Sequence, residues 1–194
     1  MTTSENIKST KFQSPVPFLI RLRNLIFGKT KPDIYTRITF YLNLLIWLAF
    51  MLWSIISYIT ISSRKLINDI KKIPVESIIQ ERGIELGFSE DTFITRLTTF
   101  HAISILCWSV VFIGLILLYR KKKRFIYFIL GGTTFYVGMI IFYISFQYFR
   151  EDMTFTDKVG LLILFLSVLL HAFLMKNERS GGSISFFGEV EDDE

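Results

Sequence analysis

The fold is decided by residues 100–149, which read FHAISILCWSVVFIGLILLY, then RKKKR, then FIYFILGGTTFYVGMIIFYISFQYF. Two long runs without Asp, Glu, Lys or Arg, Phe100–Tyr119 and Phe125–Phe149, flank five consecutive basic residues, Arg120–Arg124. An uncharged apolar run of about 18 residues or more is long enough to cross the hydrocarbon core of a bilayer as a helix. The stretch therefore predicts two transmembrane helices joined by a short basic turn.

Two further runs have the same character, Ile38–Ser63 and Val159–Met175. The second is the shortest, with a helical length of about 26 Å, which is near the lower limit for a span. A chain that crosses lipid must satisfy its backbone hydrogen bonds internally, which a helix does. We predict an all-α integral membrane protein with four transmembrane helices, at about residues 38–63, 100–119, 125–149 and 159–175.

The basic residues indicate the orientation of these spans. Lysine and arginine beside transmembrane helices mark the cytoplasmic side, and the short turn holds five of them, Arg120, Lys121, Lys122, Lys123 and Arg124. The N-terminal arm adds further bases, among them Arg21 and Arg23, whereas the six bases of the long first loop are matched by six acids. We therefore predict that both termini are cytoplasmic and that these bases contact lipid headgroups rather than nucleic acid.

The chain divides into three parts on this interpretation. Residues 1–36 form a cytoplasmic arm, in which Ser14–Gly28 has an apolar face and the length of an interfacial amphipathic helix. Residues 37–176 form the transmembrane domain, with a small helical outer loop at 64–99, and residues 177–194 form an acidic cytoplasmic tail. An alternative places the arm helix on a partner protein, and the tail is either a docking segment or a solvated one. The richness in Ile, Lys, Phe and Ser is typical of AT-rich bacterial genomes, so the expected membrane is the bacterial inner (cytoplasmic) membrane, with the outer loop in the periplasm.

Small and polar side chains predict how the spans pack, because lipid supplies no hydrophobic drive between helices. Span three has the clearest stripe, in which small residues recur at helical spacing. The predicted helix-packing or partner-contacting residues are Asn43, Ser54, Ser57, Gly131, Thr134, Gly138, Ser145, Gly160, Ser167 and His171. Such stripes indicate either a compact bundle or contacts with other membrane subunits.

The two histidines, His101 and His171, are the obvious candidates for metal or haem ligands. In the predicted topology they differ in depth by about 17–21 Å at the standard helical rise, which excludes a shared metal or haem. A proton relay would usually include an intramembrane carboxylate, and the spans contain none. We therefore interpret His171 as a hydrogen-bonding residue near the inner headgroup zone, on the same face as Ser167.

No other pattern in the sequence indicates catalysis. Cys107 is the only cysteine, so the chain can form no internal disulfide. We expect no enzyme activity, no metal and no cofactor. The predicted function is a non-catalytic accessory or scaffold subunit of a larger membrane complex, with the bilayer and other membrane subunits as partners. The alternatives are a small oligomeric channel or transporter component and, less favoured, a membrane enzyme that acts on lipids.

Overall fold

The computed structural model describes residues 24, 28, 32–72 and 74–179, and the chain divides into two compact units, Met1–Lys31 and Pro32–Glu194. In the first unit the amide of Gly28 donates to the carbonyl of Asn24 at 3.0 Å. The remainder of the predicted interfacial helix, with Arg21 and Arg23, lies outside the described residues. The same is true of tail residues 180–194.

Every regular element in the described part of the second unit is a helix. Among the described residues, four helices are long and apolar enough to cross a membrane, as expected of a multi-pass membrane protein. They are α2 (Ile34–Ser62), α5 (Glu90–Tyr119), α6 (Phe125–Gly138) with its continuation as the π-helix η1 (Met139–Ile144), and α8 (Phe155–Arg179). Three short helices, α3 (Arg64–Lys71), α4 (Val75–Glu85) and α7 (Phe146–Glu151), complete the unit.

The third span is shorter than predicted because the helix is interrupted at Ser145. This residue has extended backbone angles, φ −172° and ψ 157°, and its side chain accepts a hydrogen bond from the amide of Tyr148 at 3.0 Å. Ser145 therefore caps the separate helix α7 instead of packing along span three. The polar cap explains why Phe146–Phe149, although uncharged, do not extend the span.

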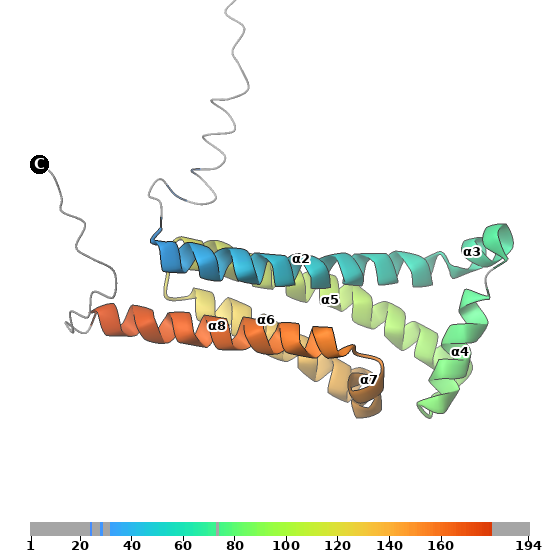
Figure 1. Ribbon diagram of the computed structural model, residues 1–194. Helices are drawn as coiled ribbons and strands as arrows, with labels where there is room; N and C mark the ends of the chain where they lie inside the picture. The colour runs from blue at the N-terminus through green and yellow to red at the C-terminus, as the bar shows by residue number, and fades with distance from the viewer. Residues whose placement is uncertain (1–23, 25–27, 29–31, 73, 180–194) are drawn as a thin grey trace, which may run out of the picture. The chain divides into compact units, whose positions relative to one another are not determined.

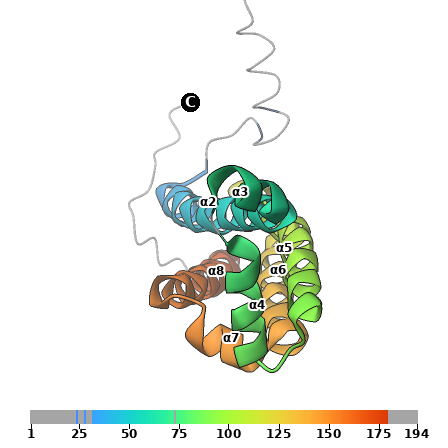
Figure 2. The same ribbon diagram turned by 90° about the vertical axis from the view of Figure 1, so that its right-hand side faces the viewer.

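The four spans form an antiparallel bundle (Figure 1). Helix α5 packs along both α2 and α6, and α8 packs against the other sides of the same two helices. Figure 2 shows the bundle from its end, with α5 and α8 on opposite sides. Each span thus has two neighbours and one face directed away from the bundle.

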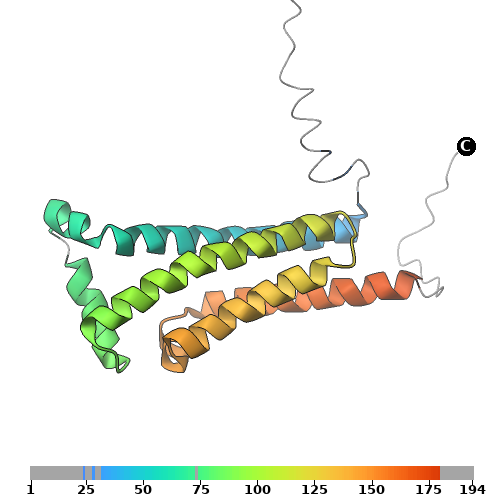
Figure 3. The same ribbon diagram turned by 180° about the vertical axis from the view of Figure 1, so that it is seen from behind.

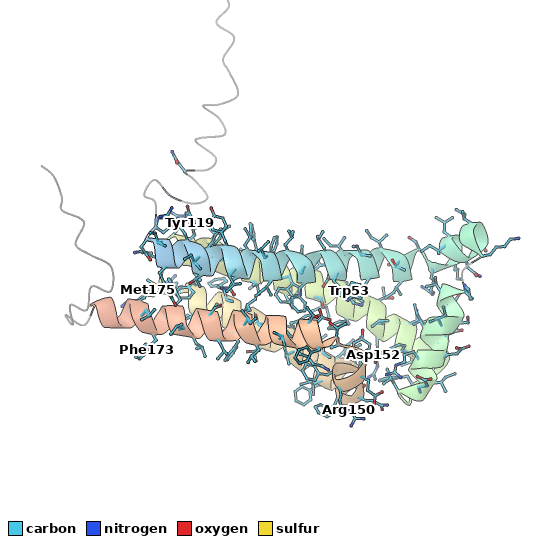
Figure 4. All side chains as sticks on the ribbon, viewed as in Figure 1. Trp53, Tyr119, Arg150, Asp152, Phe173 and Met175 are labelled. Atoms are coloured by element: carbon cyan, nitrogen blue, oxygen red, sulfur yellow. The ribbon has the colours of Figure 1, made fainter. Side chains whose placement is uncertain are left out.

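The two ends of the bundle differ in composition. The cap end carries α3, α4 and α7, and α4 packs against α5 (Figure 3). The basic end holds the turn Arg120–Arg124, the start of α2 and the end of α8. Figure 4 shows Tyr119 at the basic end, and Arg150 and Asp152 at the cap end.

Aromatic side chains fill the centre of the bundle. The rings of Phe50 and Trp108 stack with centroids 4.8 Å apart, and Tyr136 lies 5.1 Å from Trp108 and 5.9 Å from Phe50. The indole nitrogen of Trp47 donates to the backbone carbonyl of Trp108 at 2.7 Å, which joins α2 to α5. This cluster connects three of the four spans and leaves the middle of the bundle packed with rings.

Glycines allow α5 and α6 to approach each other closely. A Cβ at Gly114 of α5 would meet Ile129 Cγ1 at 2.5 Å, and a Cβ at Gly132 of α6 would meet Val111 Cγ2 at 2.7 Å. Both distances are too short for a real contact, so neither position accepts a side chain without movement. Each helix therefore offers one glycine to a branched side chain of the other.

Within one copy of the bundle, this seam does not use the small-residue stripe predicted for span three. Nothing lies within 4 Å of a Cβ built at Gly131 or Gly138, and Thr134 is exposed. The buried residues of the helix are Phe125, Ile129, Thr133 and Tyr136. Because the sequence pairs Gly131 with Gly132 and Thr133 with Thr134, small residues occur on two faces of the helix. The large apolar side chains beside Gly132 select the face that turns inward.

Candidate functional site

A polar contact joins α2 to α8 in the interior of the bundle. Asn43 is fully buried, and its amide nitrogen donates to Ser167 Oγ at 2.9 Å and to the backbone carbonyl of Thr39 at 2.8 Å. The Ser167 hydroxyl lies 3.0 Å from Asn43 Oδ1, to which it can donate in return. The structure thus brings together two residues that the sequence places 124 positions apart on different stripes. We call this pair the Asn43–Ser167 clamp.

Three other predicted packing residues have simpler roles. The Ser54 hydroxyl is buried and donates to the carbonyl of Phe50 in its own helix at 2.9 Å. Gly160 lies against α2, where an added Cβ would meet Phe50 at 3.6 Å and Ile46 at 3.8 Å. Ser57 is half-buried. Gly160 is thus placed at a contact between α8 and α2.

His171 is buried at the basic end, with 1% of its surface exposed. Its ring stacks on Tyr35 with centroids 5.3 Å apart and meets Phe125 edge-on at 5.6 Å. Neither ring nitrogen has a hydrogen-bond partner among the described residues. The expected hydrogen-bonding role is therefore not seen within the described part of the chain. Ser167, on the same face one turn earlier, is engaged with Asn43.

An ion pair lies at the basic end of the bundle, near this histidine. Lys121 Nζ lies 2.5 Å from Asp33 Oδ1, and Asp33 also accepts from the Thr36 amide at 2.9 Å and the Thr36 hydroxyl at 2.8 Å. Partial burial works to raise the pKa of Asp33, but the hydrogen bonds from Lys121 and Thr36 outweigh it and hold this pKa well below its usual range. Lys121 of the basic turn is thus paired with Asp33, the residue that caps the start of α2. The other four, Arg120, Lys122, Lys123 and Arg124, are exposed.

The two histidines lie toward opposite ends of the bundle. His101 is buried in the part of α5 nearer the cap end, whereas His171 contacts Tyr35 and Phe125, which begin α2 and α6 at the basic end. Within the described residues, no group of three or more His, Cys, Asp or Glu side chains is placed to hold a metal ion.

Arg82 ties α4 to α7 at the cap end. Its guanidinium contacts both carboxylate oxygens of Asp152, with Nε 3.0 Å from Oδ1 and Nη2 2.9 Å from Oδ2. It also donates to Glu151 at 3.0 Å and to Glu85 at 2.6 Å. These contacts with Asp152, Glu85 and Glu151 raise the pKa of Arg82. Hydrogen bonds from Arg150, Arg82 and Gln147 lower the pKa of Glu151 to about 2. We call this cluster the Arg82 latch.

Arg96 supports the π-helix from the neighbouring span. Its Nη1 donates to the carbonyl of Tyr143 in η1 at 3.0 Å, and its guanidinium lies over the rings of Phe88 and Tyr143, 5.0 and 5.6 Å from their centroids. A π-helix shifts the regular hydrogen-bond pattern of the backbone, and side chains from a neighbouring helix can satisfy the groups that it frees. Sequence reasoning missed this residue because it treated Arg96 as part of the outer loop.

A groove opens between α6–η1 and α8 on the side of the bundle. It has a volume of about 500 Å³ and an almost wholly apolar lining. Two members of the predicted stripe of span three, Thr134 and Gly138, lie in this groove rather than in a helix seam. Lys158 contributes a cation to the lining, and Phe149 of α7 lies beside it.

No family model, curated protein or solved structure matches this chain.

Proposed function

We propose that the protein is a non-catalytic scaffold or accessory subunit of a larger complex in the bacterial inner membrane. The observation that carries this proposal is the Asn43–Ser167 clamp, in which a fully buried amide side chain is used to join two helices. Ser54, Ser104 and Thr133 likewise donate to carbonyls one turn earlier in their own helices. Polar groups used in this way hold a bundle together.

The orientation proposed with this function follows the basic residues. With the basic end in the cytoplasm, both termini lie there and the cap of α3, α4 and α7 lies in the periplasm. The N-terminal arm would then lie along the inner leaflet. The cytoplasmic arm and tail, together with the membrane-facing sides of the spans, are the surfaces that we propose for partner subunits.

The aromatic centre favours a scaffold over the alternative of an oligomeric channel. Asn43 and Ser54 are buried inside one copy of the bundle, so they are not placed to line a pore between copies. A path through the single bundle would have to pass the stacked rings of Phe50 and Trp108. Such a path would require the helices to separate.

Co-purification tests the proposal directly. The full chain with a small affinity tag at residue 1 is extracted from native membranes in a mild detergent and analysed by mass spectrometry and native gel electrophoresis. We expect a fixed set of membrane proteins to accompany it at constant stoichiometry, and not to accompany an equally expressed, tagged four-span protein. A homogeneous particle of this chain alone would contradict the scaffold proposal, and solute flux in liposomes would then be measured.

A further inference from the structure

The groove between α6–η1 and α8 has the form of a lipid site. Gly138 forms part of its wall, and the space beside this glycine is open for at least 4 Å from a built Cβ. Leu161, Leu162 and Phe165 of α8 line the opposite wall. Since Thr133 and Thr134 lie in α6 and Phe149 in α7, the groove runs from the cap end toward the middle of the span.

The cation at the cap end of the groove has no carboxylate partner among the described residues. Lys158 Nζ donates to the backbone carbonyl of Arg150 at 2.7 Å and lies 5.7 Å from the centre of the Phe149 ring. The nearby acids are bound elsewhere, since Asp157 accepts from Thr154 and Asp152 pairs with Arg82. Lys158 thus keeps two ammonium protons and an uncompensated charge for an anion.

The position of Lys158 matches the level of lipid headgroups. It lies in the first turn of α8, where the apolar span begins at Phe155. Basic pockets between transmembrane helices bind anionic headgroups at the cytoplasmic face, and the same charge attraction acts on a phosphate in the outer leaflet, where the proposed orientation places Lys158. An acyl chain of a lipid whose phosphate met Lys158 would extend along the apolar wall.

We propose that this groove binds one anionic phospholipid, with its phosphate at Lys158 and one acyl chain between α6–η1 and α8. The charge distribution of the groove favours a lipid over a partner helix. Its lining is almost wholly apolar apart from the ammonium of Lys158 at the cap end, which matches an acyl chain that carries an anionic headgroup at one end.

Native mass spectrometry of the full chain tests this site with phosphatidylglycerol and phosphatidylcholine as the probes. We expect one phosphatidylglycerol to remain bound under conditions that remove phosphatidylcholine. Lys158→Gln should weaken its retention about fivefold, the effect of one base beside an anionic headgroup. Lys65→Gln, which removes an exposed base of α3 outside the groove, should leave it unchanged.

Two glycines supply a matched pair for the acyl chain. Gly138→Leu fills the groove and should abolish retention of phosphatidylglycerol, whereas Gly131→Leu, at an open position of the same helix that does not line the groove, should retain it. Thr134→Leu narrows the same wall and provides a second test if Gly138→Leu does not fold. Equal retention in the Gly138 and Gly131 variants, or equal losses in the two lysine variants, would overturn the proposal. A dimer that Gly138→Leu dissociates would also overturn it, because the groove would then hold a second copy.

Discussion

Two seams of the same bundle are held in different ways. The α5–α6 seam depends on the absence of side chains, since Gly114 faces Ile129 and Gly132 faces Val111. The α2–α8 seam depends on the hydrogen bonds of the Asn43–Ser167 clamp. Close approach and polar contact are the two means by which helices associate in lipid. The first seam is sensitive to added volume and the second to lost donors and acceptors.

The largest effect is expected from volume added at the α5–α6 seam. Gly114→Ala places a Cβ 2.5 Å from Ile129 Cγ1 and 3.0 Å from the backbone nitrogen of Ile129, so the backbones must separate. Overpacking of this kind typically costs about 1–3 kcal/mol. Thermal unfolding in detergent, followed by circular dichroism, should show a lower melting temperature. Gly131→Ala is the control at an open position, and equal melting temperatures of the two variants would contradict the close approach of the helices.

Loss of the clamp should have the next largest effect. Asn43→Leu removes the amide and is expected to cost about 0.6 kcal/mol and at most about 1.7 kcal/mol, the measured range for interhelical hydrogen bonds in membranes. A double-mutant cycle with Ser167→Ala isolates the contact, because each single change breaks the same pair. Ser54→Ala, which loses a bond within one helix, is the control. Additive effects of the Asn43 and Ser167 changes would show that the clamp does not couple the helices.

The Arg82 latch should make the cap end sensitive to acid. Glu151 has a folded-state pKa of about 2, below its ordinary value of 4.5, so its contribution to stability is fully present above about pH 4.5 and is lost as the pH falls toward 2. Melting temperatures of the wild type and Arg82→Gln, measured from pH 6 to pH 2, should converge in acid. We expect a smaller difference at pH 6 than for Asn43→Leu, because the latch is exposed to water. A difference in melting temperature between the two proteins that stays constant over this pH range would contradict the stabilising role of the Arg82 latch.

The smallest effect is expected at the glycine of the second seam. At Gly160 an added Cβ would lie 3.6 Å from Phe50, which is an ordinary contact. Gly160→Ala should therefore leave the melting temperature unchanged or raise it slightly, since alanine favours a helix over glycine by at most about 1 kcal/mol. Gly132→Ala, measured in parallel, should lower it. Equal melting temperatures of the Gly160→Ala and Gly132→Ala variants would contradict the expected difference between the two seams.

The sequence predicted the spans well because the bilayer itself fixes their length and polarity. Charge-free runs located all four, and a capping Ser145 inside an uncharged run is the reason that the third ends early. Polar stripes also directed attention to Asn43 and Ser167, since a buried amide in a span needs a partner. The identity of that partner depended on the packing of α2 against α8, for which the sequence holds no local signal.

The face of α6 and the contacts at the two ends could not be predicted for physical reasons. Gly131 and Gly132 are equivalent in sequence, and only the neighbours of the folded helix distinguish them. Arg82 binds Asp152, which lies 70 residues further along the chain. Acids closer to Arg82 in the sequence are equally plausible partners, so the sequence alone does not select Asp152. The capping role of Asp33 had a signal, because it directly precedes the first turn of α2, but its pairing with Lys121 required the antiparallel contact of α2 with α5.

The single cysteine has a practical consequence for measuring orientation. Cys107 is buried, with 8% of its surface exposed, and lies within the span of α5, so a membrane-impermeant thiol reagent should give a silent background in intact cells. Cysteines introduced one at a time at Lys122 and Thr154, on opposite ends of the bundle, can then be labelled without removing the native Cys107. The natural sequence thus already gives a low background, against which labelling of a cysteine on either side of the membrane can be measured.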